Sequence, residues 1–170
     1  GENIDQLLLQ NAWYYLALKG ELELARLFGK SDDVQTIQTM MKRMEDNFDH
    51  RFWTGSSYRS PDYKGESDDR GNALAVVSGL ASKDKYPALK TLLTTEYHAS
   101  PYMEKYVLEA LFCMDATDEA LDRIRKRYKT MVEYPGLTTL PENWIDETIQ
   151  LKPGEPMINA FWGTYNHGWS

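Results

Sequence analysis

The stretch DDRGNALAVVSGLA, residues 68–81, decides the fold of this chain. It opens with two aspartates, and the rest is almost entirely small or apolar, with no polar face at helical spacing. Acidic residues favour the positive N-terminal end of a helix, and a helix without a polar face is stable only when it is buried on all sides. We therefore expect a deeply buried helix here, covered by the segments on either side.

Two longer helices are predicted before this stretch. Residues 3–28 carry apolar residues at helical spacing, and Gly29 stands where a helix would stop. Residues 30–53 show the same spacing, with Ser31 as N-cap and acids in the first turn. We expect the second helix to pair back on the first, and the polar segment 54–66, rich in Gly, Ser and Pro, to form a loop.

Three further helices are predicted after the buried one. Residues 86–97 form a shorter two-faced segment, and residues 99–114 offer Ser100 as an N-cap. Residues 116–132 have Thr117 as N-cap, one apolar face, and Arg and Lys opposite it. We expect this last helix to lie on the outside, and Pro and Gly break regular structure after it.

The six helices alternate in character. The first, third and fifth are the more apolar, and their followers carry the charge. Alternating inner and outer helices build a helical toroid or a solenoid, and the absence of a fixed repeat makes an ordinary array the weaker choice. We predict an all-α fold of helical hairpins in one domain, residues 1–170, ending in an irregular rim segment, 133–170.

Composition excludes several functions. The net charge of -7 and the absence of a face dense in Lys or Arg argue against nucleic acid as a partner. No apolar run is long enough to span a membrane. Cys113 lies in an apolar run and is expected to be a small buried hydrophobe. His50, His98 and His167 show no metal-ligand spacing, so we predict neither a metal nor a cofactor.

Four polar and aromatic segments fall at one mouth of the predicted toroid. In such a fold the starts of the inner helices line one opening. The segments found there are SDDR (67–70), ASPYMEKY (99–106), TTLPENW (138–144) and YNHGWS (165–170). They are the candidates for a binding or catalytic site.

These segments resemble the catalytic domain of bacterial α-L-rhamnosidases, which are six-hairpin (α/α)6 barrel glycoside hydrolases. The resemblance covers nearly the whole chain in the family's order, and TTLPENW followed by NHGWS is its most specific part. The matching stretches are NAWYYLALKGELELARLFGK, DDRGNALAVVSGLA, SPYMEKYVLEALFCM, RIRKRYKTMV, TTLPENW and NHGWS. The resemblance implies that the helical hairpins form about half of an (α/α)6 toroid, its C-terminal half.

The resemblance also implies an inverting hydrolase in which Glu142 is the general base. Inversion needs a protonated acid on the leaving oxygen and a carboxylate on the opposite face of the sugar, about 6.5–9.5 Å away. The family's general acid lies upstream of the first helix here, so we expect this chain to be inactive alone. Pro141 stands where many members have Trp, which removes one aromatic wall. Without the resemblance, Glu142 reads as a solvated loop carboxylate or a cap.

Further residues are implied as sugar contacts. His167 matches a histidine that hydrogen-bonds the sugar in this family, and Asn166 stands beside it. Trp144 offers a flat ring to sugar C–H groups. Asp69, Arg70 and Tyr102 fall at the predicted rim. For Asp69 the competing interpretation is helix-dipole stabilisation alone, because acids at a helix start are expected anyway.

Two functions remain open. The first is part of a glycoside hydrolase acting on terminal α-L-rhamnose or a similar deoxy-sugar. The second is a non-catalytic helical module that binds carbohydrate or another protein. Because the sequence ends abruptly and the predicted fold is half a barrel, we expect the chain to be a piece of a longer protein. We also expect it to self-associate through exposed inner helices. The resemblance suggests a periplasmic or extracellular setting and leaves a cytoplasmic one open.

Overall fold

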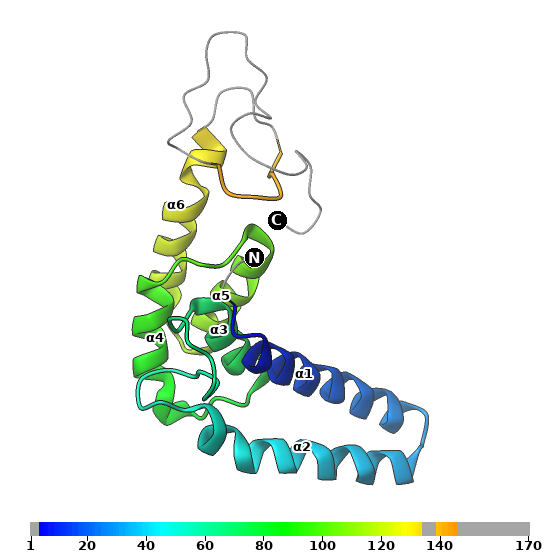
Figure 1. Cartoon of the computed structure of the whole chain (residues 1–170). Coiled ribbons are helices and arrows are strands. Elements are labelled where there is room, and N and C mark those ends of the chain that lie inside the picture. Colours follow the sequence, from blue (N-terminus) through cyan, green and yellow to red (C-terminus); the bar gives the residue numbers. More distant parts are fainter. Residues whose placement is uncertain (1–3, 134–138, 146–170) are drawn as a thin grey trace.

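The described part of the chain is built from helices. A computed structural model describes residues 4–133 and 139–145. Apart from a single antiparallel bridge between Trp53 and Tyr58, these ranges hold no strand. The all-α prediction is confirmed. The elements, coloured along the chain in Figure 1, are α1 (Gln6–Leu27), α2 (Ser31–Phe52), α3 (Asp69–Ser78), the short 3-10 turn η1 (Lys83–Lys85), α4 (Tyr86–Thr95), α5 (Pro101–Cys113) and α6 (Thr117–Glu133).

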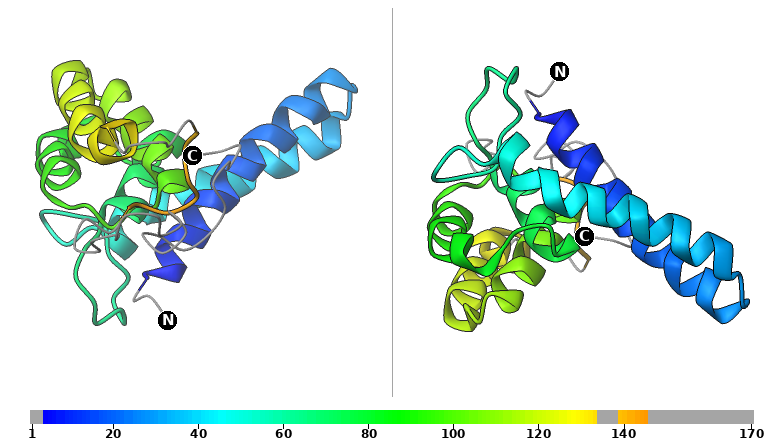
Figure 2. Two further views of the ribbon diagram at one scale, coloured as in Figure 1. Left: turned by 90° about the horizontal axis from the view of Figure 1, so that it is seen from above. Right: turned by 90° about the horizontal axis from the view of Figure 1, so that it is seen from below.

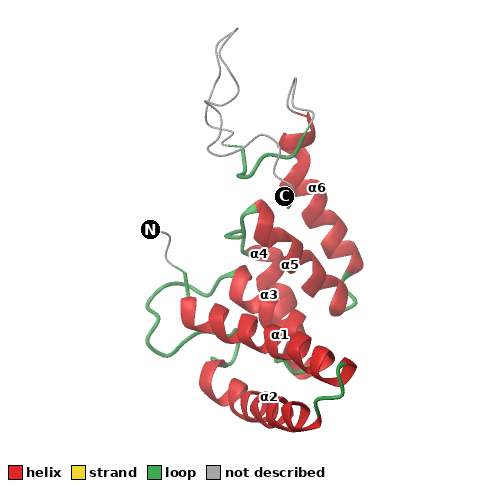
Figure 3. Cartoon of the chain, turned by 90° about the vertical axis from the view of Figure 1, so that its right-hand side faces the viewer, coloured by secondary structure: helices red, strands yellow, loops and turns green. Residues whose placement is uncertain are grey.

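The helices pair as three hairpins in chain order. α1 packs against α2, α3 against α4, and α5 against α6. The first members also contact one another, since α3 packs against both α1 and α5. In Figure 3 the helices form a stack that rises from the α1–α2 pair to α6. This arrangement matches the predicted row of inner helices, each followed by a partner. The expectation that every partner carries the charge was wrong for α4, in which Lys90 is the single charged residue.

The buried helix at the centre of the stack is confirmed. Nine of the ten residues of α3 are buried. Asp68 caps the helix by accepting hydrogen bonds from the amides of Arg70, at 2.9 Å, and Gly71, at 3.4 Å. A Cβ on Gly71 would lie 2.7 Å from Leu8 Cδ2, so only glycine lets α1 approach this closely. The helix ends at Gly79, whose φ of 87° is left-handed.

The α1–α2 hairpin projects from the rest of the molecule. Figure 2 shows it from two sides as an arm. Near its base the hairpin shares the main core through Leu8, Tyr15 and Phe48. Its outer half has a separate small core, formed by Leu18, Leu22, Ala25 and Ile37. Neither α1 nor any other described helix combines the length and the apolar character that crossing a bilayer requires.

Several expectations about side chains were wrong. Ser31 is the first residue of α2 rather than its N-cap, which is Lys30. Cys113 is exposed, because it is the last residue of α5, where the helix reaches the surface. Thr117 is the first residue of α6 rather than its N-cap, and the nearby Glu119 forms an ion pair with Lys90. The cations of α6 do not all face outward, since the side chain of Arg123 is only 1% exposed.

Candidate functional site

The starts of the three inner helices meet in the structure. Asp5 caps α1 and also accepts hydrogen bonds from the amide and hydroxyl of Ser60, in the loop before α3. Leu8 lies against Gly71 at the start of α3. The amide of Ala99, just before α5, donates to Asp69 Oδ2 at 3.3 Å. The starts of α1, α3 and α5 are therefore linked by direct contacts.

A single arginine of α6 joins the starts of α3 and α5. Arg123 of α6 donates from Nε to Glu104 Oε1 at 2.6 Å and from Nη2 to Glu104 Oε2 at 3.0 Å. The same Nη2 donates to Asp69 Oδ2 at 2.5 Å. Its Nη1 donates to the carbonyls of Leu93, at 2.5 Å, and Glu96, at 2.7 Å. One side chain from an outer helix thus bonds α3, α4, the loop after α4, and α5.

A second arginine balances the charge of this cluster. Arg127 Nε lies 3.5 Å from Glu104 Oε2, so Asp69, Glu104, Arg123 and Arg127 carry two negative and two positive formal charges. Burial by itself lowers the pKa of Arg123, but its hydrogen bonds and the charges of Glu104 and Asp69 outweigh this and raise it. Burial lowers the pKa of Arg127. We call these four residues the buried ion cluster.

The rim segment 139–145 is anchored to the buried ion cluster by Trp144. Its indole Nε1 donates to the carbonyl of Ala99 at 2.7 Å, and Arg127 Nη2 donates to that same carbonyl. The guanidinium carbon of Arg127 lies 4.1 Å from the centre of the Trp144 ring. Tyr128 meets the ring edge-on, with centroids 5.1 Å apart. Trp144 therefore fastens an irregular segment at the mouth.

A small hollow opens beside this anchor. It has a volume of about 210 Å³, and its walls include Tyr97, Lys126, Arg127 and Trp144. Lys126 Nζ lies 4.0 Å from the centre of the Tyr97 ring, and the guanidinium carbon of Arg123 lies 4.6 Å from it on a cation–π contact. The hollow is therefore aromatic and cationic, a surface that suits a polar ligand with flat apolar faces.

The predicted site residues fall into two groups. Glu142 is half-buried and belongs to the anchored rim segment, two residues before Trp144. Tyr102 is 39% exposed and packs edge-on against Tyr106. Asp69 and Arg70 are buried, not exposed at a rim, and Arg70 Nη2 pairs with Asp68 Oδ2 at 2.8 Å.

The two remaining predicted residues, Asn166 and His167, lie outside the described residues. The sugar-contact roles of all these side chains, and the catalytic role of Glu142, stay predictions. In residues 4–133 and 139–145, no group of three or more His, Cys, Asp or Glu side chains is arranged to hold a metal ion.

Sequence reasoning missed the residues that organise the mouth. Glu104 could be interpreted as an acid completing the first turn of α5, yet it is fully buried and bonded to Arg123. A signal for Arg123 and Arg127 was present. They fall on the same helical stripe as Ala120 and Met131, both buried, and a cation on an apolar stripe indicates a buried partner.

The fold is similar to part of a known glycosidase. It matches the crystal structure of a GH78 family rhamnosidase of Bacillus sp. GL1 with a TM-score of 0.69 and 18% sequence identity. The match covers 94% of this chain and 17% of that chain. No protein-family model matches this chain, and no curated protein sequence does. At this identity the similarity establishes a shared helical fold.

Proposed function

We propose that this chain is part of an inverting glycoside hydrolase for terminal α-L-rhamnose or a similar deoxy-sugar, in which Glu142 is the general base. The observation that carries the proposal is the anchored rim segment. Trp144 holds this segment against Ala99, at the meeting point of the inner helix starts. The similarity to part of a GH78 family rhamnosidase supports the same interpretation.

The proposed chemistry is a single displacement. Glu142 takes a proton from a water molecule, and that water attacks the anomeric carbon from the face opposite the leaving group. A general acid about 6.5–9.5 Å away gives a proton to the departing oxygen. We place this acid outside the present chain, which accordingly is inactive by itself.

The acids at the helix starts are unsuited to that second role. Both oxygens of Glu104 are already bonded to Arg123, and the side chain is 0% exposed. Asp69 Oδ2 accepts from Arg123 and from the amide of Ala99. A general acid must reach the leaving oxygen with a free proton, and these groups face inward.

Sugar binding in this proposal uses residues around the same mouth. Trp144 and Tyr102 supply aromatic surface, and Asn166 and His167 supply hydrogen bonds to hydroxyls. Asp69 and Arg70 contribute by fixing the position of the start of α3. A direct sugar contact by either side chain requires the residues that cover it to move.

The test is hydrolysis of an aryl α-L-rhamnoside by the full polypeptide that carries this chain, compared with the chain alone. We expect turnover only by the full polypeptide, and a loss of about 100- to 10,000-fold in kcat for Glu142→Gln. Glu21→Gln, an exposed acid on α1, is the matched control and should retain full activity. Unchanged activity in the Glu142 variant contradicts the proposal.

A second candidate function is a non-catalytic module that binds carbohydrate. It is favoured by one observation: among the described residues, the two fully buried acids at the inner helix starts, Asp69 and Glu104, are engaged by Arg123. Calorimetry with rhamnosides separates the two functions. Binding by the full polypeptide without any turnover supports the module, whereas turnover that depends on Glu142 excludes it.

A further inference from the structure

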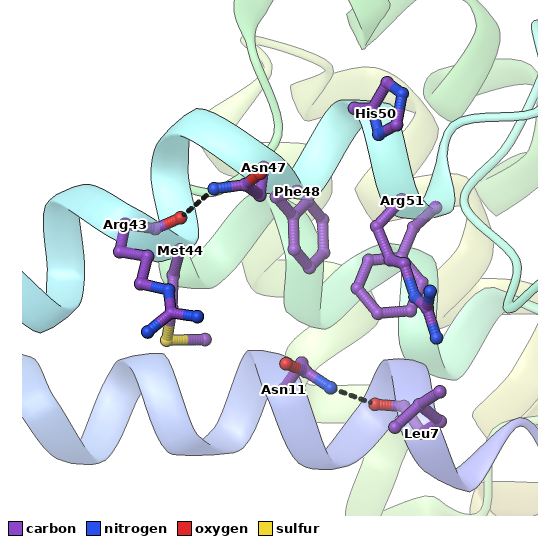
Figure 4. A pocket seen from close by; sticks show the side chains of 9 residues that line it. Leu7, Asn11, Arg43, Met44, Asn47, Phe48, His50 and Arg51 are labelled. Carbon is purple, nitrogen blue, oxygen red and sulfur yellow. Dashed lines mark hydrogen bonds between the residues drawn. The ribbon is translucent and has the colours of Figure 1, made fainter.

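A groove runs between α1 and α2 at the base of the projecting α1–α2 hairpin. It has a volume of about 550 Å³ and is lined by α2 between Arg43 and Phe52 and by Leu7 and Asn11 of α1. Figure 4 shows the side chains of Arg43 and Arg51 reaching from α2 toward α1. The groove combines cationic groups with an apolar floor.

The positive charge of this groove is not neutralised within the described chain. The neighbouring acids of α2 are all engaged elsewhere: Glu45 accepts from Tyr15, Asp46 pairs with Lys42, and Asp49 accepts from Tyr58 and Ser82. In residues 4–133 and 139–145, neither the Arg43 nor the Arg51 guanidinium has an ion-pair or hydrogen-bond partner. An acidic ligand is therefore the expected occupant.

The outer tip of the same hairpin carries the opposite charge to the groove. Asp32 and Asp33 are exposed at the start of α2, and their carboxylates have no ion-pair partner in the described residues. Beside them, Leu27 is 76% and Phe28 is 69% exposed. Large apolar side chains this exposed, next to unpaired acids, are typical of an interaction surface.

The spacing along α2 makes this face self-complementary. Asp33 and Arg51 are 18 residues apart, which is about five helical turns, so they lie on the same side of the helix at its opposite ends, ~27 Å apart. Met40, which is 38% exposed, and the partly buried Met44 lie on the same stripe, equally far from its midpoint. If the helix is turned end for end about that midpoint, Asp33 changes places with Arg51 and Met40 changes places with Met44.

We propose that the side of α2 that carries Asp33, Met40, Met44 and Arg51 binds a second copy of this chain in an antiparallel, two-fold arrangement. Asp33 of each copy meets Arg51 of the other, Met40 of each meets Met44 of the other, and each hairpin tip enters the opposite groove. Two 22-residue helices side by side offer a face of roughly 33 by 18 Å, about 600 Å² per copy. This lies at the lower end of stable interfaces, so the dimer is concentration-dependent.

Sedimentation velocity over a concentration series tests this contact. We expect a monomer–dimer equilibrium that weakens as salt rises, because exposed charges are screened. Arg51→Glu and Asp33→Arg should each weaken dimerisation by about tenfold or more, because each change places like charges together at both ends of the interface. Lys129→Glu, an exposed charge reversal on α6, should leave the dimer unchanged.

Mixing the two variants gives the decisive result. In a mixed pair, Asp33 of the Arg51→Glu chain faces Arg51 of the Asp33→Arg chain, and the new glutamate faces the new arginine. Both ends are attractive again, so the mixture should dimerise at about the wild-type concentration. A wild-type chain that stays monomeric at high concentration, or a mixture that stays as weak as its components, overturns the proposal. Circular dichroism of each variant confirms that it is folded.

Discussion

Arg123 Nη2 lies 2.5 Å from Asp69 Oδ2, and the two side chains are 1% and 0% exposed. The residues are 54 positions apart in sequence and belong to α6 and α3. The bond therefore joins the last described hairpin to the buried central helix. Because Arg123 also bonds Glu104 of α5, one side chain links the starts of α3 and α5.

Removing that side chain should be costly. Arg123→Met leaves Asp69 and Glu104 buried without their main cation. Removing one partner of a buried ion pair lowers the free energy of unfolding by about 3–5 kcal/mol. Urea denaturation followed by circular dichroism measures the loss. Arg125→Met, whose partner Asp122 is exposed, is the matched control and should change stability by less than about 0.5 kcal/mol. Equal, small effects of both variants would contradict the assigned role of Arg123.

The contact between α1 and α3 should show coupling between two substitutions. Gly71→Ala places a methyl group against Leu8 and should cost about 1–3 kcal/mol. Leu8→Ala alone creates a cavity and should cost about 2–5 kcal/mol. In the double variant the new methyl occupies part of that cavity, so the double variant should lose less stability than the two single variants together. Additive losses in a thermal-unfolding cycle would argue that α1 does not rest on Gly71.

Trp144 should be recognisable by its indole proton. Its Nε1–H donates to the Ala99 carbonyl at 2.7 Å, so we expect slow hydrogen exchange in ¹⁵N-resolved spectra. Trp13 is the internal comparison, because its indole nitrogen has no hydrogen-bond partner in the described residues, and it should exchange faster. Trp144→Phe should destabilise the fold by about 1 kcal/mol. Fast exchange at Trp144 would show that the rim segment is not anchored.

Alkaline pH should destabilise the fold through its tyrosines. Burial, followed by its bond to Tyr102, raises the pKa of Tyr106 to about 12, and burial with the bond to Asp49 raises the pKa of Tyr58. The unfolded chain loses these protons near pH 10, before the folded chain does. The stability is therefore complete below about pH 10 and falls as pH rises from about 10 to 12.

Tyr58→Phe tests that alkaline loss. Because phenylalanine has no hydroxyl proton to lose, the variant should show a shallower decline of stability above about pH 10, although it is less stable at neutral pH. Tyr14→Phe, an exposed tyrosine on α1, is the control and should follow the wild-type curve. A Tyr58 variant with the same alkaline slope as the wild type would contradict the raised pKa.

Most of the helical architecture was predictable from local pattern. All six helices begin and end within a few residues of the expected positions, because apolar spacing and breakers such as Gly29 act locally. The buried helix was expected over residues 68–81, and the left-handed Gly79 ends it earlier. Ser100 and Asp68 cap their helices with side-chain oxygens. The deep burial of α3 followed from its lack of a polar face.

The buried ion cluster was not predictable in the same way. Glu104 and Asp69 each look like ordinary first-turn acids, and only the three-dimensional approach of α6 pairs them with Arg123. Because its sequence is rich in Arg and Lys, α6 was predicted to lie on the outside with all of its cations in solvent. The position of Trp144 on Ala99 likewise depends on a contact between residues 45 positions apart.

The central claim is that Glu142 activates water, and azide rescue tests it most directly. Glu142→Ala in the full polypeptide should lose about 100- to 10,000-fold in kcat on an aryl α-L-rhamnoside, because no base remains to deprotonate the water. Sodium azide needs no deprotonation, so it should restore turnover and give a rhamnosyl azide of inverted configuration. A variant that keeps its activity, or one that azide leaves inactive although it is folded and binds rhamnoside, would contradict the account.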